Sequence, residues 1–273
     1  MSLISTEIAE KNLKKFKIID ASWHLPFEDR NPYLEYKENH IYNSVFFDLD
    51  KTSKKDTDLP HMLPTEEQWS KSISELGISN NDKILIYDNS TLYSACRCWF
   101  SLLYFGHDIE KLHILNGGLK KWKLENKPLT NKKTKVEISN YKAKKTDKHV
   151  FNMSQINDNI NSKNFVVVDA RSFKRFNGDI DEPRVGLRKG NIKNSICLPF
   201  GECINQNTNE FKTNDELKLI FERIINTNNN NFVFTCGSGV TASVLAYAYK
   251  IINNDYEPII YDGSWSEYGK YTP

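Results

Sequence analysis

Short apolar runs alternate with helical patterns in both halves of the chain. The runs Ile84–Tyr87 and Phe232–Thr235 are continuous and rich in β-branched and aromatic side chains, as is typical of strands buried on both faces of a sheet. A segment with helical spacing follows each run, at 94–105 and at 241–252. Because strands that alternate with helices form parallel sheets covered by helices, we predict an α/β fold.

The chain also repeats itself once. Three pairs of short segments match at offsets of 149 (18 to 167), 151 (40 to 191) and 146 residues (115 to 261), which is too long for a solenoid. Three matches at nearly one offset indicate a duplicated domain. The pairs are Ile-Ile-Asp-Ala at 18–21 with Val-Val-Asp-Ala at 167–170, His-Ile-Tyr-Asn-Ser at 40–44 with Asn-Ile-Lys-Asn-Ser at 191–195, and Leu-Asn-Gly-Gly at 115–118 with Tyr-Asp-Gly-Ser at 261–264.

We therefore predict two tandem domains of the same architecture, each a parallel sheet flanked by helices. The first covers residues 1–130 and the second covers residues 150–273. Residues 131–149 between them hold seven Lys and two acidic residues, a composition typical of a solvated linker.

The composition excludes several functional classes. The 273 residues are 39% hydrophobic and 26% charged with a net charge of +2, which favours a soluble globular protein and gives no support for nucleic-acid binding. No apolar stretch is long enough to span a membrane. Residues 1–15 lack the apolar segment of a secretory signal, so we expect a cytoplasmic protein. The five cysteines form no C-x-x-C pair, which predicts neither a zinc site nor a disulfide framework.

The segment Cys-Gly-Ser-Gly-Val-Thr at 236–241 gives the clearest indication of catalytic chemistry. It follows a predicted buried strand and opens a predicted helix, at the place where open α/β sheets bind ligands. Gly237 and Gly239 let the backbone turn its N–H groups inward, and amides at a helix N-terminus stabilise an anion. We therefore expect Cys236 to be a thiolate nucleophile rather than a buried structural cysteine.

Two chemistries use a loop of this kind. Cysteine-dependent phosphatases place an Arg six positions after the Cys to bind the phosphate, and here that position is Ala242. Persulfide chemistry needs only the loop amides, since the transferred sulfur is smaller and carries less charge. The loop therefore favours sulfur transfer over phosphate hydrolysis.

These segments resemble the rhodanese superfamily, and within it the 3-mercaptopyruvate sulfurtransferases, over nearly the whole chain. The loop at 236–241 is similar to the active loop of that family, whereas thiosulfate sulfurtransferases carry Arg and Lys at the positions of Gly237 and Ser238. The other matching segments are Phe-Phe-Asp-Leu-Asp at 46–50, Pro-His-Met-Leu-Pro at 60–64, Leu-Tyr-Ser-Ala at 92–95 and Tyr-Asp-Gly-Ser-Trp at 261–265.

The resemblance implies two similar domains, of which only the second is active. The repeat offset places Asp88 where the second domain has Cys236, so we expect the first domain to be catalytically inactive. The resemblance also implies that Arg175 and Arg184 bind the substrate, because two arginines can clamp the carboxylate and the carbonyl oxygen of a 2-oxo acid. It assigns further substrate contacts to the loop itself, at Gly237, Gly239, Val240 and Thr241.

His61 and Asp50 match a family pair proposed to act with the loop serine, here Ser238. The arrangement resembles a serine–histidine–aspartate relay, which would supply the proton that the departing pyruvate enolate needs. The alternative is that His61, which lies between two prolines, has only a packing role. The sequence leaves both interpretations open.

The sequence departs from the family at one type of turn. The family's His-Ile-Pro-Gly turn ends in Asn43 in the first half and in Asn194 in the second. Asn can adopt the left-handed conformation that Gly would supply, so we expect both turns to form.

We therefore expect a sulfurtransferase that moves sulfur from 3-mercaptopyruvate, through a Cys236 persulfide, to a thiol or to cyanide and releases pyruvate. The thiol would be thioredoxin or a small thiol, and no metal or organic cofactor is required. One alternative is a thiosulfate sulfurtransferase, which is disfavoured because Gly237 and Ser238 carry no cation for a sulfonate. The other is a non-enzymatic persulfide carrier or protein-binding module, which the intact loop disfavours.

Overall fold

The computed structural model describes residues 3–224 and 231–270, and the chain divides into two compact units. Each half of the chain lends a short segment to the unit that the other half mainly forms. Unit 1 consists of residues 1–55, 63–146 and 206–211, and unit 2 consists of residues 56–62, 147–205 and 212–273.

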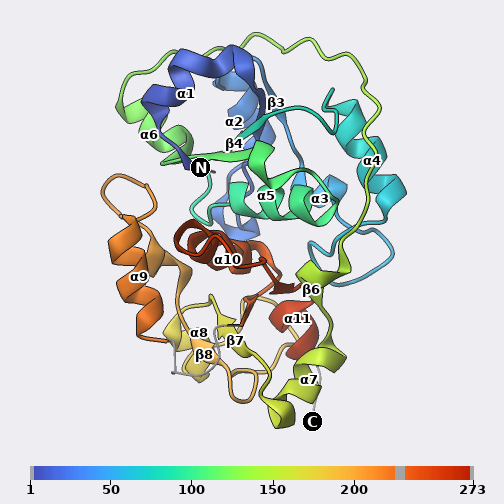
Figure 1. The fold of residues 1–273 in the computed structure, drawn as a ribbon, viewed down its shortest axis with the longest axis vertical. Coiled ribbons are helices and arrows are strands. Elements are labelled where there is room, and N and C mark those ends of the chain that lie inside the picture. Colours follow the sequence, from blue (N-terminus) through green and yellow to red (C-terminus); the bar gives the residue numbers. More distant parts are fainter. Residues whose placement is uncertain (1–2, 225–230, 271–273) are drawn as a thin grey trace. The chain divides into compact units, whose positions relative to one another are not determined.

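Unit 1 is built on a five-stranded parallel sheet in the order β1-β5-β4-β2-β3 (Figure 1). The strands are β1 (Leu3–Ile4), β2 (Lys17–Asp20), β3 (Ser44–Phe46), β4 (Ile84–Tyr87) and β5 (Leu112–Leu115). The α-helices are α1 (Thr6–Asn12), α2 (Pro32–Glu38), α3 (Leu49–Thr52), α4 (Glu66–Glu75), α5 (Ala95–Tyr104) and α6 (Gly118–Leu124), with 3-10 turns η1 (Leu13–Lys15), η2 (Pro26–Glu28) and η3 (Ile109–Lys111).

Unit 2 is built on a second five-stranded parallel sheet, in the order β6-β10-β9-β7-β8. The strands are β6 (Val150–Phe151), β7 (Val166–Asp169), β8 (Ile196–Cys197), β9 (Phe232–Thr235) and β10 (Ile260–Tyr261). The α-helices are α7 (Met153–Ser162), α8 (Phe173–Asn177), α9 (Asn214–Glu222), α10 (Val240–Ile252) and α11 (Ser264–Tyr268), with 3-10 turns η4 (Asp147–His149) and η5 (Phe200–Cys203).

The two sheets have the same strand order, because β6 to β10 of unit 2 correspond in sequence to β1 to β5 of unit 1. Their registers agree as well: the last residue of β2 lies opposite the last residue of β4, and the last residue of β7 lies opposite that of β9. Asp88 and Cys236 directly follow β4 and β9, so they are structurally equivalent. The predicted α/β fold of two similar domains is confirmed.

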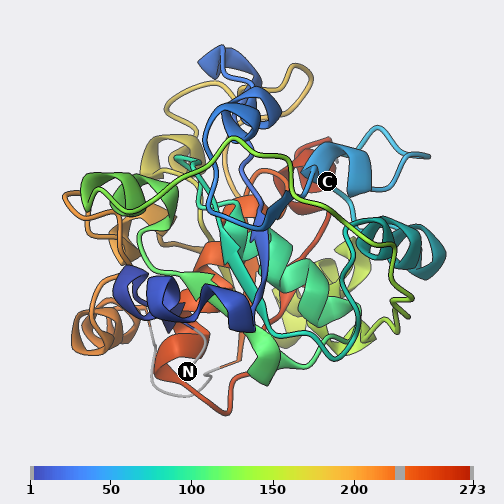
Figure 2. The same cartoon turned by 90° about the horizontal axis from the view of Figure 1, so that it is seen from above.

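Helices cover both faces of each sheet (Figure 1, Figure 2). On one face, Ala9 of α1 and Trp122 of α6 pack onto the sheet of unit 1, and Ile156 of α7 and Trp265 of α11 do the same in unit 2. On the other face, α5 packs on β4 and β5, and α10 packs on β9 and β10. Both of these helices are buried along most of their length, which explains why they are apolar on nearly every side.

Both turns that carry Asn in place of Gly form as predicted. Asn43 has a φ of 63° and Asn194 has a φ of 65°, so each adopts the left-handed conformation. Each precedes its Ser by one residue in the turn that leads into β3 or β8.

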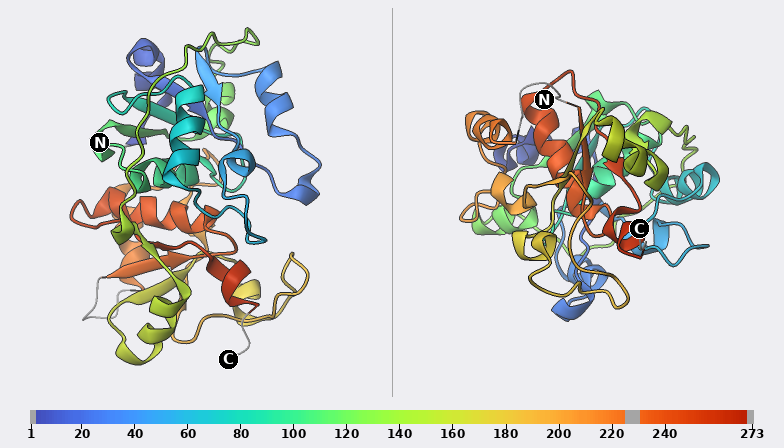
Figure 3. Two further views of the ribbon diagram at one scale, coloured as in Figure 1. Left: turned by 90° about the vertical axis from the view of Figure 1, so that its right-hand side faces the viewer. Right: turned by 90° about the horizontal axis from the view of Figure 1, so that it is seen from below.

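The Lys-rich segment extends along unit 1 past α4 (Figure 3). Most of its residues are exposed, but its backbone is anchored at several points. The N–H of Ser139 donates to the carbonyl of Ser74 at 3.0 Å, and the N–H of Lys144 donates to that of Phe105 at 3.0 Å. The division between the units falls after Thr146, so the segment belongs to unit 1 up to that residue.

Candidate active site

Cys236 lies at the carboxyl end of β9, directly before the turn into α10. The residue is 2% exposed. Gly239 precedes α10 with a φ of 79°, a left-handed conformation that Gly adopts without steric strain. The turn places the N-terminus of a 13-residue helix at the loop, where the free N–H groups and the helix dipole favour negative charge.

The first turn of α11 binds the backbone of this loop. The N–H of Trp265 donates to the carbonyl of Cys236 at 2.9 Å, and the N–H of Ser266 donates to the carbonyl of Gly237 at 2.9 Å. The hydroxyl of Ser266 donates to the same Gly237 carbonyl at 2.5 Å. The N–H of Cys236 donates to Oγ of Ser264 at 3.4 Å. These contacts fix the two residues with which the loop begins.

The loop serine contacts two of the predicted site residues. Nδ1 of His61 lies 2.9 Å from Oγ of Ser238, and Nη2 of Arg184 donates to the same oxygen at 3.5 Å. All three residues belong to unit 2, because the segment 56–62 is part of that unit. Since an arginine can only donate, Ser238 accepts from Arg184 and can donate its own proton to Nδ1 of His61.

Both predicted substrate arginines stand beside Gly237. A Cβ at this position would lie 3.2 Å from Nη2 of Arg175 and 3.6 Å from Nη1 of Arg184. The glycine therefore makes room for the guanidinium of Arg175, whereas a Cβ would make only an ordinary contact with that of Arg184. The loop itself carries no cation, and two guanidiniums from another part of the chain stand next to it.

A buried carboxylate holds one of these arginines. Glu182 accepts from Nη2 of Arg175 at 2.5 Å and from Nη1 of Arg171 at 2.6 Å. Arg171 also pairs with Asp169 at 2.7 Å. Burial alone would lower the pKa of Arg171, but the adjacent carboxylates of Asp169 and Glu182 hold that pKa above its usual value. Arg184 adds a further guanidinium beside the loop.

A tryptophan connects this charged group to the loop. The guanidinium of Arg171 lies 4.3 Å and that of Arg188 lies 4.6 Å from the centroid of Trp265. The indole Nε1–H of Trp265 donates to the carbonyl of Arg188 at 3.0 Å. Cation–π contacts and a hydrogen bond therefore join the arginine-bearing segment to the residue that binds the carbonyl of Cys236.

Asp50, the fourth predicted catalytic residue, belongs to unit 1. It lies on α3, and its Oδ2 accepts the indole N–H of Trp23 at 3.0 Å. The amide groups of Val240 and Thr241 begin α10, and both residues are buried. The structure therefore gathers Cys236 and its loop with His61, Arg175 and Arg184 in unit 2, and it places Asp50 in the other unit.

The other cysteines have a different character. Burial raises the pKa of the Cys203 thiol to about 12, and burial likewise raises that of Cys197 to about 12. Cys96 and Cys98 are buried on α5. Thiols with such raised pKa values stay protonated at neutral pH and are poor nucleophiles.

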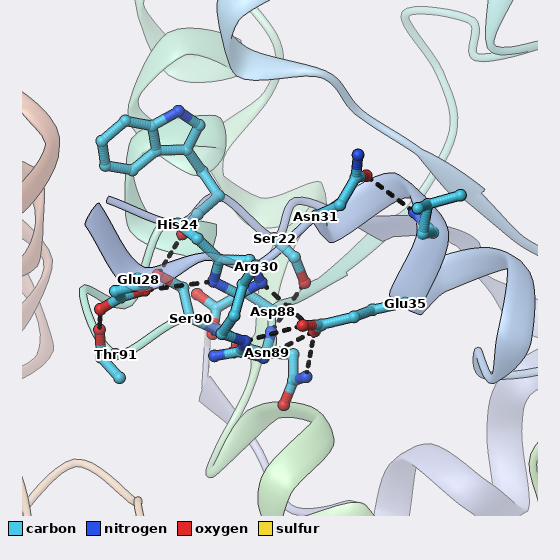
Figure 4. A network of polar contacts seen from close by, with 12 residues as sticks. Ser22, His24, Glu28, Arg30, Asn31, Glu35, Asp88, Asn89, Ser90 and Thr91 are labelled. Atoms are coloured by element: carbon cyan, nitrogen blue, oxygen red, sulfur yellow. Dashed lines mark hydrogen bonds and ion pairs between the residues drawn. The ribbon is translucent and has the colours of Figure 1, made fainter. Parts of the chain in front are cut away.

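Unit 1 carries an aspartate, Asp88, at the position equivalent to Cys236. Side-chain hydrogen bonds hold the loop that follows it (Figure 4). The carboxylate of Asp88 accepts from the N–H of Ala95 at 2.6 Å and from that of Ser90 at 3.3 Å. The side-chain amide of Asn89 donates to Glu35 at 2.8 Å. Glu35 also accepts from Nη2 of Arg30 at 2.6 Å and from its Nε at 2.7 Å. Two amides of this loop are thus occupied by its own carboxyl group, and the N–H of Asn89 donates to Oγ of Ser22 at 2.8 Å. The remaining contacts of the network involve His24, Glu28, Asn31 and Thr91.

Sequence reasoning missed Glu182, Trp265 and Ser266 as parts of the site. Glu182 was visible as a carboxylate seven positions after Arg175, but nothing local indicates that one acid joins two arginines. In the described part of the chain, no three or more His, Cys, Asp and Glu side chains are grouped as a metal site. Nor does any helix within those residues have the length and apolar character needed to cross a membrane.

Comparison with known proteins identifies close relatives. The model of the rhodanese-like domain matches residues 5–125 and 152–271. The Arabidopsis thaliana thiosulfate/3-mercaptopyruvate sulfurtransferase 1, mitochondrial, is 35% identical over 97% of this chain and 75% of its own. The human 3-mercaptopyruvate sulfurtransferase is 35% identical over 92% of this chain and 84% of its own. The crystal structure of SseA from Escherichia coli, a 3-mercaptopyruvate sulfotransferase, superimposes with a TM-score of 0.86 at 32% identity and covers 98% of this chain and 100% of that one.

Proposed function

This chain belongs to the rhodanese family, and we propose that it is a sulfurtransferase that takes sulfur from 3-mercaptopyruvate onto Cys236 and passes it to a thiol. The relatives named for this donor, at 35% identity over most of the chain, support the proposal. The observation that carries it is the placement of two arginines beside Gly237 and of Ser238 within contact of Arg184 and His61.

The arginines beside Gly237 favour an anionic donor. Arg175 and Arg184 would bind the carboxylate and the carbonyl oxygen, each contact contributing roughly 1.5–3 kcal/mol. This clamp would hold the donor sulfur over Cys236.

In the first half-reaction, the thiolate of Cys236 attacks the sulfur of 3-mercaptopyruvate. A sulfur–sulfur bond forms, the carbon–sulfur bond breaks, and its electron pair leaves with the carbon as the enolate of pyruvate. The enolate takes up a proton at carbon, and Cys236 keeps the sulfur as a persulfide.

The hydroxyl of Ser238 would give its proton to the enolate. His61, whose Nδ1 lies 2.9 Å from that hydroxyl, would replace the proton with one taken from the acceptor thiol in the second half-reaction. We keep Asp50 in the relay on the strength of the family resemblance, as a proposal that substitution can test. Gly237, Gly239, Val240 and Thr241 would stabilise the persulfide through their backbone amides.

In the second half-reaction, a thiolate attacks the outer sulfur and leaves as a persulfide, while Cys236 returns to its starting form. Cyanide would give thiocyanate in the same way. We propose thioredoxin or a small thiol as the acceptor, and a cytoplasmic location. Cell fractionation tests the location, since the Arabidopsis relative is mitochondrial by name.

The second candidate function is thiosulfate sulfur transfer by the same cysteine. The guanidiniums beside Gly237 favour some activity with this dianion. The deciding experiment measures sulfur transfer from 3-mercaptopyruvate and from thiosulfate to one thiol acceptor under the same conditions. We expect a higher kcat/KM for 3-mercaptopyruvate. A preference for thiosulfate would overturn the donor assignment. If neither donor gave any sulfur transfer, the proposal that the protein is a sulfurtransferase would be overturned.

A further inference from the structure

Ser266 is the third residue of α11, and it is 2% exposed. Its N–H and its hydroxyl both donate to the carbonyl of Gly237, at 2.9 and 2.5 Å. A carbonyl oxygen has two lone pairs, and here one residue occupies both. The neighbouring carbonyl, that of Cys236, receives the N–H of Trp265 at 2.9 Å.

These contacts set the direction of the loop amides. In a trans peptide the C=O and the following N–H point in opposite directions, because the unit is planar. A carbonyl of Gly237 held toward α11 therefore turns the N–H of Ser238 away from α11. By the same argument, the carbonyl of Cys236 turns the N–H of Gly237 the same way. Two consecutive N–H groups are thus oriented by bonds made on their opposite side.

The duplicated unit shows that this arrangement is not a general requirement of the fold. The equivalent turn in unit 1 keeps one of the bonds, from the N–H of Leu119 to the carbonyl of Asp88 at 2.8 Å. The residue after Leu119 is Lys120, which has no hydroxyl. The hydroxyl contact to the next carbonyl therefore belongs to the unit that carries the cysteine.

We propose that Ser266 is a positioning residue, which orients the peptide between Gly237 and Ser238 so that its N–H stabilises the anionic sulfur on Cys236. The proposal deepens the proposed function and rests on Cys236 being the sulfur carrier. Ser266 acts through the loop backbone, and it is distinct from the residues that would bind the donor. Neither its position in the helix nor its hydroxyl implies a ligand of its own.

The test compares Ser266→Ala with Ser266→Thr, which keeps the hydroxyl. Alkylation of Cys236 by iodoacetamide is followed against pH in the absence of any donor, and persulfide formation is followed in a single turnover. Ser195→Ala is the matched control, because the Ser195 hydroxyl also donates to a carbonyl of unit 2, that of Ile192 at 2.6 Å.

We expect Ser266→Ala to move half-maximal alkylation to higher pH and to slow single-turnover persulfide formation by about three- to tenfold, the effect of one lost hydrogen bond. The KM for the donor should change little. Ser266→Thr should restore both readouts, and Ser195→Ala should leave both unchanged.

An alkylation profile of Ser266→Ala that overlays the wild type would overturn the proposal. So would an equal change in Ser195→Ala, which would show a general loss of stability. Because alkylation needs no donor, it tests Ser266 even if 3-mercaptopyruvate proves to be the wrong substrate. Failure of the wild type to form a persulfide would instead count against the proposed function.

Discussion

Oγ of Ser238 lies 2.9 Å from Nδ1 of His61, although 177 residues separate the two along the chain. We propose that this pair delivers a proton to the enolate. Ser238→Ala and His61→Ala should therefore each slow turnover of 3-mercaptopyruvate by roughly 10²-fold, the usual contribution of a general acid. Turnover of thiosulfate should slow much less, since sulfite leaves without needing a proton.

The double substitution of His61 and Ser238 distinguishes a relay from two separate contributions. Residues that act as a unit are not additive, so the double variant should be about as slow as either single variant. Equal slowing with both donors would instead assign His61 the packing role.

Cys236→Ser should reduce turnover with every donor by roughly three or more orders of magnitude, because a serine hydroxyl cannot carry the transferred sulfur. Mass spectrometry of the wild type after donor treatment should show one added sulfur on Cys236. Cys197→Ala is a suitable control, since burial raises the pKa of that thiol to about 12, and it should retain full activity. Added sulfur on Cys203 in place of Cys236 would contradict the assignment.

Gly237→Ala should raise the KM for 3-mercaptopyruvate by about tenfold, which corresponds to one weakened contact to a charged group. The new Cβ would lie 3.2 Å from Nη2 of Arg175, so that guanidinium must move. The thermal unfolding midpoint should stay within a few degrees of the wild type, since a flexible side-chain end is what has to yield. An unchanged KM would show that the position of Arg175 does not matter for donor binding.

Glu182→Gln should change both stability and donor choice. The substitution removes the charge that Arg171 and Arg175 share, so we expect a loss of about 3 kcal/mol in the free energy of unfolding. The site would gain one net positive charge, and the ratio of kcat/KM for thiosulfate to that for 3-mercaptopyruvate should rise. Steady-state kinetics with both donors, beside thermal unfolding, measure the two effects. A fall in that ratio would contradict the charge argument for donor choice.

Unit 1 should lose stability as the pH rises. Burial raises the pKa of Asp88 to about 7 and that of Asp20 to about 6, so the folded unit binds these protons more tightly than the unfolded chain does. The stabilisation is present at low pH and is lost as the pH rises through 6 and 7. Between pH 5 and pH 8 we expect a loss of roughly 2–4 kcal/mol.

Hydrogen exchange of peptides from β2 and β4, corrected for the intrinsic pH dependence of exchange, measures this change for unit 1 alone. Asp88→Asn should remove most of it while keeping an oxygen to accept from Ala95. If the variant and the wild type show the same pH dependence, then Asp88 does not titrate as the burial of its carboxyl group implies.

Much of the fold follows from local patterns in the sequence. The apolar runs at β4 and β9 matched the observed strands residue for residue, and the two predicted helices began and ended within one residue of α5 and α10. These segments are buried on all sides, so their composition reports their environment directly. The repeat offset likewise paired Asp88 with Cys236, because both halves keep the same strand register.

The parts of the site that were missed depend on contacts between distant segments. The pairing of Glu182 with two arginines, and of Ser266 with Gly237, leaves no periodic signal in the chain. The exchange of the segments 56–62 and 206–211 between units is also invisible to a local pattern, because polar loops look alike wherever they are placed.

That exchange has a consequence for how the protein is made. His61 leaves the ribosome 177 residues before Ser238, a delay of roughly 10–35 s at ordinary rates of synthesis. During that interval the segment at 56–62 has no unit 2 to join, and its final contacts can form only after the second half of the chain has been translated. The two halves began as copies, yet neither now encodes a complete unit. Recombination that swapped one half for that of a relative would therefore have to match both borrowed segments.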